Sequence, residues 1–226
     1  MKRKDIFLIL LSMVFIACSK TDEDNPVLTY DYFPLEAGNY IEYKVIEYTY
    51  DDFNNTVDTN EYFLKEKVDS VANVVEGVSI FQLKRYTMAI DDSTETWILK
   101  DVWTTERSSQ HAIRTEENVK FVNLSFPLQR NKSWDGNARN DSSAQSYVVL
   151  DFELRNEIGS TSFAQTTRVN KRNDVNLVKE NFAEDIFARG VGLVYRIKRD
   201  LILNPADTSI VSGYDHEWTY QSHGKE

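Results

Sequence analysis

Cys18 is the residue whose type and setting point most directly to chemistry, and it is the single cysteine of the chain. Basic residues at 2–4 precede an almost unbroken apolar run at 6–17 that leads up to it. A run of about a dozen residues is too short to cross a bilayer core of about 30 Å as a helix, but it suits the core of a signal peptide. An exported protein would normally pair its thiols, so a lone thiol here needs another role.

The residues that end this run, Phe15-Ile16-Ala17-Cys18, resemble the lipobox of bacterial lipoproteins. Phe15 departs from the aliphatic residue that is usual at its position. The resemblance implies removal of a signal peptide at 1–17 and thioether lipidation of Cys18. Multiple acyl chains hold a protein firmly, since each buried CH₂ contributes about 0.8 kcal/mol.

An acidic, polar stretch follows at 18–29 and suits a flexible tether. It is similar to the acidic export signal of surface lipoproteins in Bacteroidota, although a plain solvated linker explains it nearly as well. The chain thus resembles uncharacterised Bacteroidota-type outer-membrane lipoproteins. That resemblance implies a lipid anchor in the outer membrane, with the protein at the cell surface or, alternatively, on the periplasmic face.

The charge balance of the chain disfavours a nucleic-acid partner. The formal net charge is −10, and without residues 1–17 it becomes (26 − 3) − (36 − 1) = −12. Proteins that bind nucleic acid draw much of their affinity from Lys and Arg that neutralise phosphates. A domain of this size buries enough surface to need no disulfides.

Several patterns resemble catalytic, nucleotide or metal sites, but each lacks residues that such a site requires. Gly190-x-Gly192 lacks a third glycine and a following helix, so a bulge or tight turn is predicted there. The three histidines, His111, His216 and His223, have no metal-ligand spacing. Alternate oxygens at 52–58 suggest a calcium loop, but its glycine and closing glutamate are absent, which favours a hairpin turn. We therefore expect no catalytic residue, no metal and no cofactor.

Two serines are candidates for surface modification. Asp92-Ser93-Thr94 and Asp69-Ser70-Val71 resemble the short acceptor for O-glycosylation in Bacteroidota. Ser93 is the better candidate because its sequence predicts a turn. Glycosylation there would add solubility and leave the fold unchanged.

The dominant sequence period is two, the period of a β-strand. In 146–154 it places Val148, Leu150, Phe152 and Leu154 on one face, and in 193–203 it opposes an apolar set to Arg196, Lys198 and Asp200. Segment 176–188 fits either a helix or a strand. Tyr, Phe and Trp total 28 residues against twelve Gly and Pro, which also favours strands.

These patterns predict an all-β domain at 30–226 with eight to ten antiparallel strands. A strongly curved sheet or open barrel is favoured, and a β-sandwich is the alternative. Phe-Pro-Leu occurs at 33–35 and again at 126–128, either from two similar half-sheets or by coincidental reuse of a turn. The 33–40 and 188–195 segments resemble motifs of uncharacterised secreted β-proteins, which imply a curved sheet and no activity.

The expected function is that of a non-catalytic envelope lipoprotein that binds an apolar small molecule or lipid in its curved sheet. The alternative is an accessory lipoprotein that binds a protein partner in an outer-membrane complex; an enzyme is less favoured than either. Six aromatic residues are candidates to line a ligand site, although such residues more often belong to the core: Tyr43, Tyr48, Trp97, Trp103, Tyr195 and Trp218.

Overall fold

The computed structural model describes residues 29–91 and 93–226. The proposed signal peptide, Cys18 and all but the last residue of the proposed tether lie outside the described residues. A short 3₁₀ helix, η1 (Thr29–Tyr32), is followed by β1 (Asn39–Asp51), β2 (Thr56–Val75), β3 (Val78–Ala89), β4 (Ile98–Arg107), β5 (His111–Glu116), β6 (Val119–Ser125), β7 (Ser133–Asp135), β8 (Ser146–Ile158), β9 (Thr161–Val175), β10 (Lys179–Ala188), β11 (Gly192–Leu203) and β12 (Ile210–Lys225).

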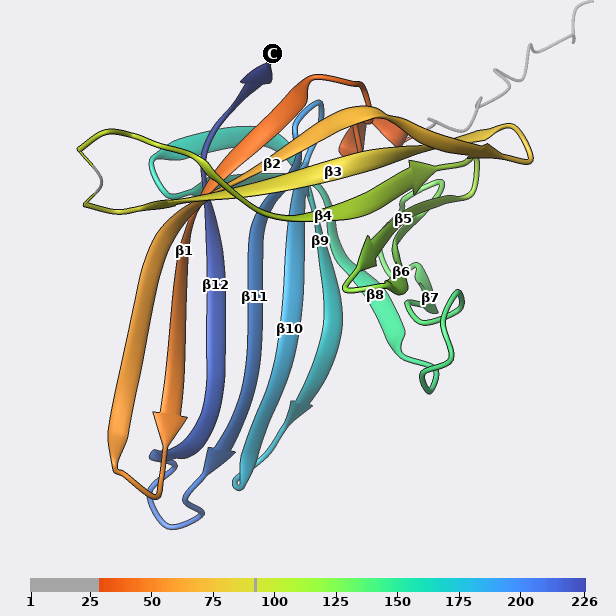
Figure 1. The fold of residues 1–226 in the computed structure, drawn as a ribbon. Helices are drawn as coiled ribbons and strands as arrows, with labels where there is room; N and C mark the ends of the chain where they lie inside the picture. Colours follow the sequence, from red (N-terminus) through yellow and green to blue (C-terminus); the bar gives the residue numbers. More distant parts are fainter. Residues whose placement is uncertain (1–28, 92) are drawn as a thin grey trace, which may run out of the picture.

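All twelve strands of the described residues belong to one antiparallel sheet, in the order β6-β5-β4-β3-β2-β1-β12-β11-β10-β9-β8-β7 (Figure 1). Consecutive strands pair, and the pairing of β1 with β12 joins the two ends of the meander. The edge strands β6 and β7 also meet, because Val122 N donates to Gly136 O at 2.9 Å and the Trp134 indole donates to Val122 O at 2.7 Å. The sheet is therefore nearly closed and barrel-like.

This architecture confirms the predicted all-β class and curved sheet, and it is not the alternative sandwich. Twelve strands form, which is more than the eight to ten expected. The short β5 and β7 and the polar β9 carry too little apolar alternation to predict a strand. Segment 176–188, which fitted helix or strand, forms β10. Gly190 and Gly192 make the predicted tight turn, with φ of 78° and 108°.

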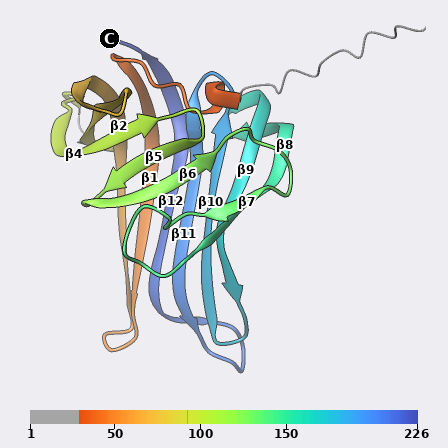
Figure 2. The ribbon, with the colours of Figure 1, turned by 90° about the vertical axis from the view of Figure 1, so that its right-hand side faces the viewer.

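The sheet bends so that β4, β5 and β6 cross in front of β1, β12, β11 and β10 (Figure 2). Strand β2 is 20 residues long, and its pairing with β3 shifts register between Val68 and Val71 and again between Val71 and Asn73. Such bulges bend a strand and increase its twist. The main apolar core lies inside the bend and includes Tyr43, Leu64 and Trp218.

The apolar face predicted for β8 does not form as expected. Register shifts between Val149 and Asp151 and beyond interrupt the alternation of this strand. Tyr147 and Val149 are buried instead, while Leu150 and Leu154 are 37% and 50% exposed. Bulges of this kind cannot be read from an alternating sequence, because they change which residues share a face.

A second, smaller core lies under the tip of the β8–β9 hairpin. A Cβ placed on Gly159 would be 3.4 Å from Thr219 Cγ2, so the hairpin tip reaches across β10 and β11 to β12. The buried members of this core are Ile158, Phe163, Ile186, Ala188, Val194 and Tyr220.

The two Phe-Pro-Leu segments meet at η1. The Tyr30 and Phe126 rings pack edge to face at 4.9 Å, and Leu128 N donates to Thr29 Oγ1 at 2.7 Å. Phe33 and Leu128 belong to the main core. Each segment precedes six consecutive strands, β1–β6 or β7–β12, and the similarity of the two half-sheets stays a prediction.

Candidate functional site

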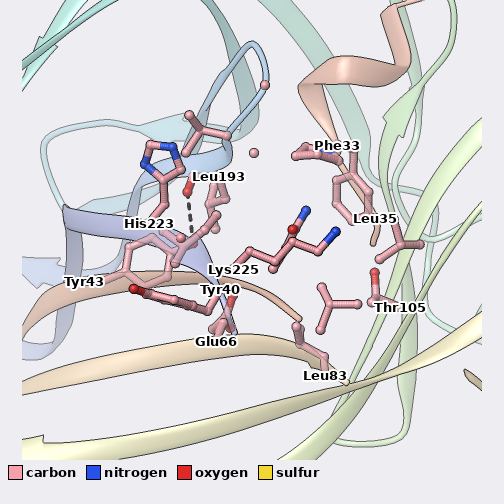
Figure 3. Close-up of a pocket in the computed structure, with 18 of the residues that line it drawn as sticks. Phe33, Leu35, Tyr40, Tyr43, Glu66, Leu83, Thr105, Leu193, His223 and Lys225 are labelled. Carbon is pink, nitrogen blue, oxygen red and sulfur yellow. Dashed lines mark hydrogen bonds between the residues drawn. The ribbon is translucent and has the colours of Figure 1, made fainter. Parts of the chain in front are cut away.

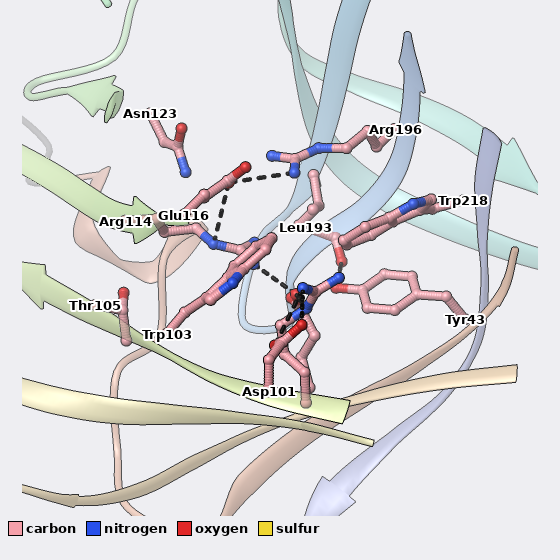
Figure 4. A network of polar contacts seen from close by, with 12 residues as sticks. Tyr43, Asp101, Trp103, Thr105, Arg114, Glu116, Asn123, Leu193, Arg196 and Trp218 are labelled. Atoms are coloured by element: carbon pink, nitrogen blue, oxygen red, sulfur yellow. Dashed lines mark hydrogen bonds and ion pairs between the residues drawn. The ribbon is translucent and has the colours of Figure 1, made fainter. Parts of the chain in front are cut away.

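Charged side chains occupy the middle of the concave face. We call the following set the interior ion-pair network: Glu66, Arg85, Asp101, Arg114, Glu116, Lys171, Asp185 and Arg196. Figure 4 labels Asp101, Arg114, Glu116 and Arg196 of this set. Four members are cationic and four are anionic, so the network is balanced. Glu66, Arg85, Arg114 and Asp185 are at most 6% exposed. An unpaired charge buried to this extent would be strongly destabilising, so each must find an opposite partner.

One half of the network centres on Glu66 of β2. Its carboxylate accepts a hydrogen bond from Arg114 Nη2 at 2.5 Å and lies 3.3 Å from Arg85 Nε. Arg85 also donates through Nη1 to both oxygens of Asp101, at 3.2 and 3.0 Å. Strands β2, β3, β4 and β5 are thereby linked through their inward side chains.

The other half centres on Asp185 of β10. Arg196 donates to both of its oxygens, from Nε and Nη2, each at 2.9 Å, and Lys171 Nζ lies 2.5 Å away. Glu116 joins the two halves, because its carboxylate lies 3.3 Å from Arg196 Nη1 and 3.6 Å from Arg114 Nε. A continuous chain of opposite charges therefore crosses the interior.

The surrounding charges keep the carboxylates of Glu116 and Asp185 ionised. Burial alone would raise the pKa of Glu116, but Arg196 and Arg114 outweigh it and lower that pKa to about 2. Burial would likewise raise the pKa of Asp185, and Arg196 and Lys171 hold it well below its usual range. Lys171 is buried beside Arg196, and its pKa falls below the ordinary value despite Asp185.

Aromatic rings cover the cations of the network. The Arg85 guanidinium lies 3.5 Å from the centroid of the Trp103 ring, and Arg196 lies 5.0 Å from that of Trp218. Cations over indole faces gain electrostatic attraction, and more so away from water. Trp218 packs in turn on Tyr43, whose hydroxyl donates to Leu193 O at 2.9 Å.

A half-enclosed cavity of about 330 Å³ opens next to Glu66 and Arg114 (Figure 3). We call it the apolar cavity, because most of its wall is hydrocarbon: Phe33, Pro34, Leu35, Ile41, Val68, Leu83, Val191 and Leu193. The polar residues of the lining are Asn39, Tyr40, Tyr43, Glu66, Thr105, Arg114, His223 and Lys225. It thus combines an apolar body with a few polar groups, the composition of small-molecule sites in general.

The structure separates the six aromatic candidates. Tyr43 lines the apolar cavity, while Trp103 and Trp218 lie in the adjacent interior against the network. Tyr48 packs beside Tyr50 at 6.3 Å, Trp97 lies under Lys65 Nζ at 4.9 Å, and Tyr195 packs against the second core. The role of each in ligand binding stays a prediction.

The remaining sequence candidates lie at the surface. Ser93 is exposed in a turn and Ser70 is exposed on β2, so both are accessible to modification. In residues 29–91 and 93–226, no group of three or more His, Cys, Asp or Glu side chains could hold a metal ion. No helix in the same residues has the length and apolar character needed to cross a membrane.

Comparison with known proteins adds little to this geometry. No family model matches the chain, and no curated protein matches it either. Among solved structures, a putative lipoprotein from Parabacteroides distasonis ATCC 8503 aligns with 85% of this chain and 98% of its own length, at 10% sequence identity and a TM-score of 0.42. At that score the similarity carries no conclusion about function.

Proposed function

We propose that this protein is a non-catalytic envelope lipoprotein that holds a small molecule or lipid with a mainly apolar body in the apolar cavity. The cavity itself is the observation that carries the proposal. Its volume of about 330 Å³ is at the lower end of the range for small-molecule sites. Because most of its wall is apolar, an apolar occupant would remove that wall from water and gain hydrophobic free energy.

The polar groups of the cavity suit the head of an amphipathic ligand. Glu66 and Arg114 pair with each other, so they present a neutral ion pair rather than a single charge. Arg114 Nε lies 3.6 Å from Glu116 and makes no hydrogen bond within the described residues. A ligand oxygen beside the Glu66–Arg114 pair would lie next to a guanidinium, while its apolar chain would be buried between β2 and the segment 33–35.

The position of the cavity agrees with a membrane-derived ligand. Residues 33–35 line it, only a few positions after the proposed tether at 18–29. A lipid on Cys18 would hold this end of the domain near the outer membrane, at the cell surface or on the periplasmic face. Intact mass of the membrane-bound protein tests the anchor, because an unmodified chain that begins at Met1 would contradict it.

A pair of matched substitutions on β2 tests ligand binding. Val68 lines the cavity and is 8% exposed, whereas Val74 is 58% exposed. Val68→Phe should weaken binding of a fluorescent fatty-acid probe by at least tenfold, since the ring takes the space of the ligand. Val74→Phe should leave binding unchanged. Equal affinities for the two variants, both folded by circular dichroism, would refute the cavity as the site.

Native mass spectrometry of the delipidated protein supplies an independent test. A co-purified small molecule that is present in the wild type and reduced in Val68→Phe is the expected result. A bare chain in both, together with no binding of the probe, would argue for a protein that works through partners.

A second candidate function is that of an accessory lipoprotein with a protein partner. The β1–β2 and β9–β10 hairpins end on the same side of the molecule, away from η1 (Figure 1), and carry Phe53 at 95% and Leu177 at 66% exposure. Exposed apolar side chains in one region are typical of contact surfaces. Phe53→Ser with Leu177→Ser should then abolish co-purification of an envelope partner and leave binding of the fatty-acid probe unchanged.

A further inference from the structure

A second cavity, of about 210 Å³, lies on the other side of the interior ion-pair network. Strands β6, β9, β10 and β11 contribute to its wall, and we call it the basic cavity. Its cationic lining residues are Lys171, Arg172, Arg196 and Lys198, and its anionic ones are Glu116 and Asp185. Two positive charges are therefore in excess, in a chain whose net charge is −10.

The excess resides on two particular side chains. Arg196 and Lys171 are engaged by Asp185, and Arg196 also by Glu116. In contrast, Arg172 and Lys198 have no carboxylate within ion-pair distance among the residues that the structure describes. Both lie at the more open part of the wall, where Arg172 is half-buried and Lys198 is exposed.

Asn123 provides an independent sign that an acceptor belongs in this cavity. Its side chain is 1% exposed, and Oδ1 accepts a hydrogen bond from Lys171 Nζ at 3.3 Å. Because an ammonium group can only donate, Oδ1 must face Lys171, and this fixes the orientation of the amide. Nδ2 is then left buried without a hydrogen-bond partner in the described part of the chain. Buried amide donors without an acceptor are rare and costly.

We propose that the basic cavity binds a small anionic group, a carboxylate or a phosphate, with Asn123 Nδ2 and Arg172 as hydrogen-bond donors and Lys198 as an additional positive charge. An anion would satisfy the orphaned amide and neutralise the excess charge at once. A planar guanidinium presents two parallel donors that match the oxygens of either group. The site is separate from the apolar cavity and does not depend on the function proposed for it.

Calorimetric titration of the protein with sodium phosphate and with sodium acetate, at ionic strength held constant with sodium chloride, tests the site. We expect saturable binding of at least one anion. In Arg172→Gln with Lys198→Gln, the affinity should fall at least tenfold. The control is Arg155→Gln with Lys179→Gln, which removes the same charge from β8 and β10 outside the lining of the basic cavity and should change affinity less than twofold. Arg155 is exposed, and Lys179 is half-buried and paired with Asp174.

The two anions distinguish the source of the ligand. Binding of phosphate alone supports a phosphate ester, binding of acetate alone supports a carboxylate, and either result supports the site. No saturable binding of either anion would overturn the proposal, and so would equal weakening in the two double variants.

Asn123→Leu probes the buried donor separately. It should weaken anion binding at least fivefold while the Arg155 and Lys179 control does not. Because this substitution is in the interior, thermal unfolding of the variant is measured first to show that it folds. If Asn123→Leu does not fold, the Arg172 and Lys198 pair decides the question, since neither residue is fully buried. Unchanged affinity in a folded Asn123→Leu protein would remove the amide from the site.

Discussion

The link between the two halves of the interior ion-pair network predicts a pH-dependent contribution to stability. Glu116 is the carboxylate that joins them, at 3.3 Å from Arg196 and 3.6 Å from Arg114. Its pKa moves from 4.5 to about 2 on folding. Since a tenfold change in acid dissociation is worth about 1.4 kcal/mol, this corresponds to roughly 3 kcal/mol of stability at pH 7.

The sign follows from the direction of the change. A pKa that is depressed in the folded state stabilises the protein above the unfolded pKa of 4.5, and this stability is lost as the pH falls toward 2. Glu116→Gln should therefore be destabilised by roughly 3 kcal/mol at pH 7. The deficit should shrink by about 2 kcal/mol at pH 3, where wild-type Glu116 has lost most of its advantage.

Urea unfolding of both proteins at pH 7, 5 and 3 measures this difference. Glu76→Gln is the matched control, because Glu76 is exposed in the β2–β3 turn and should show no difference at any pH. A deficit for Glu116→Gln that stays the same from pH 7 to pH 3 would refute the reasoning, since it would arise from packing and not from ionisation.

Three further predictions concern the backbone, a buried hydroxyl and a buried imidazole. Gly213 has φ of 125°, and a Cβ there would collide with the carbonyl oxygen of Asp200, so Gly213→Ala should lower the free energy of unfolding by about 2 kcal/mol or more. Tyr43→Phe removes the hydrogen bond to Leu193 O and should cost about 1 kcal/mol in urea unfolding. Burial lowers the pKa of His216 to about 4, so its ring resonances in NMR should not titrate between pH 8 and 5, and stability should decline as the pH falls from 6.5 toward 4.

The first two predictions have controls in the same chain, and the third has an outcome that would contradict it. Gly77 also has positive φ, but a Cβ there would meet nothing within 4 Å, so Gly77→Ala should cost less than Gly213→Ala. Tyr48→Phe should leave stability unchanged, because Tyr48 is outside the main core. Titration of the His216 ring near pH 6.5 would show that its environment is wetter than the structure indicates.

The strand pattern predicts most of this fold because period-two alternation is visible in most of the strands, although not in β5, β7 or β9. The 193–203 segment illustrates both success and failure. Its alternation identifies β11 and places Arg196 opposite Ile197, as found. However, an alternating sequence suggests that the charged face is solvated, whereas Arg196 points into the interior beside Trp218. The counter-charges that make this burial stable come from Asp185 on the paired strand β10 and from Glu116 on β5.

The candidate site was harder to predict for the same reason. Glu66, Arg114 and Asp185 are ordinary charged residues in their own segments, and 48 positions separate the first two. Their contact depends on a sheet that curves until strands distant in order face each other. Aromatic residues were the visible signal, and of the six candidates only Tyr43 lines the apolar cavity. Charged residues within β2, β5 and β10 were the remaining signal of the interior ion-pair network. Their sequence positions do not show which of them form ion pairs, because that depends on how the sheet folds.

The pairing of the first strand with the last has a consequence for biogenesis. The centre of the sheet joins residues as far apart as Glu42 and Ser222, which are 180 positions distant and connected by a hydrogen bond of 2.7 Å. Contacts over such a separation form slowly, because the whole intervening loop must first close. A nascent chain therefore cannot complete this sheet before its C-terminal strand has left the ribosome. If the protein crosses a membrane before it folds, as the proposed signal peptide implies, that delay would help to keep the chain unfolded during translocation.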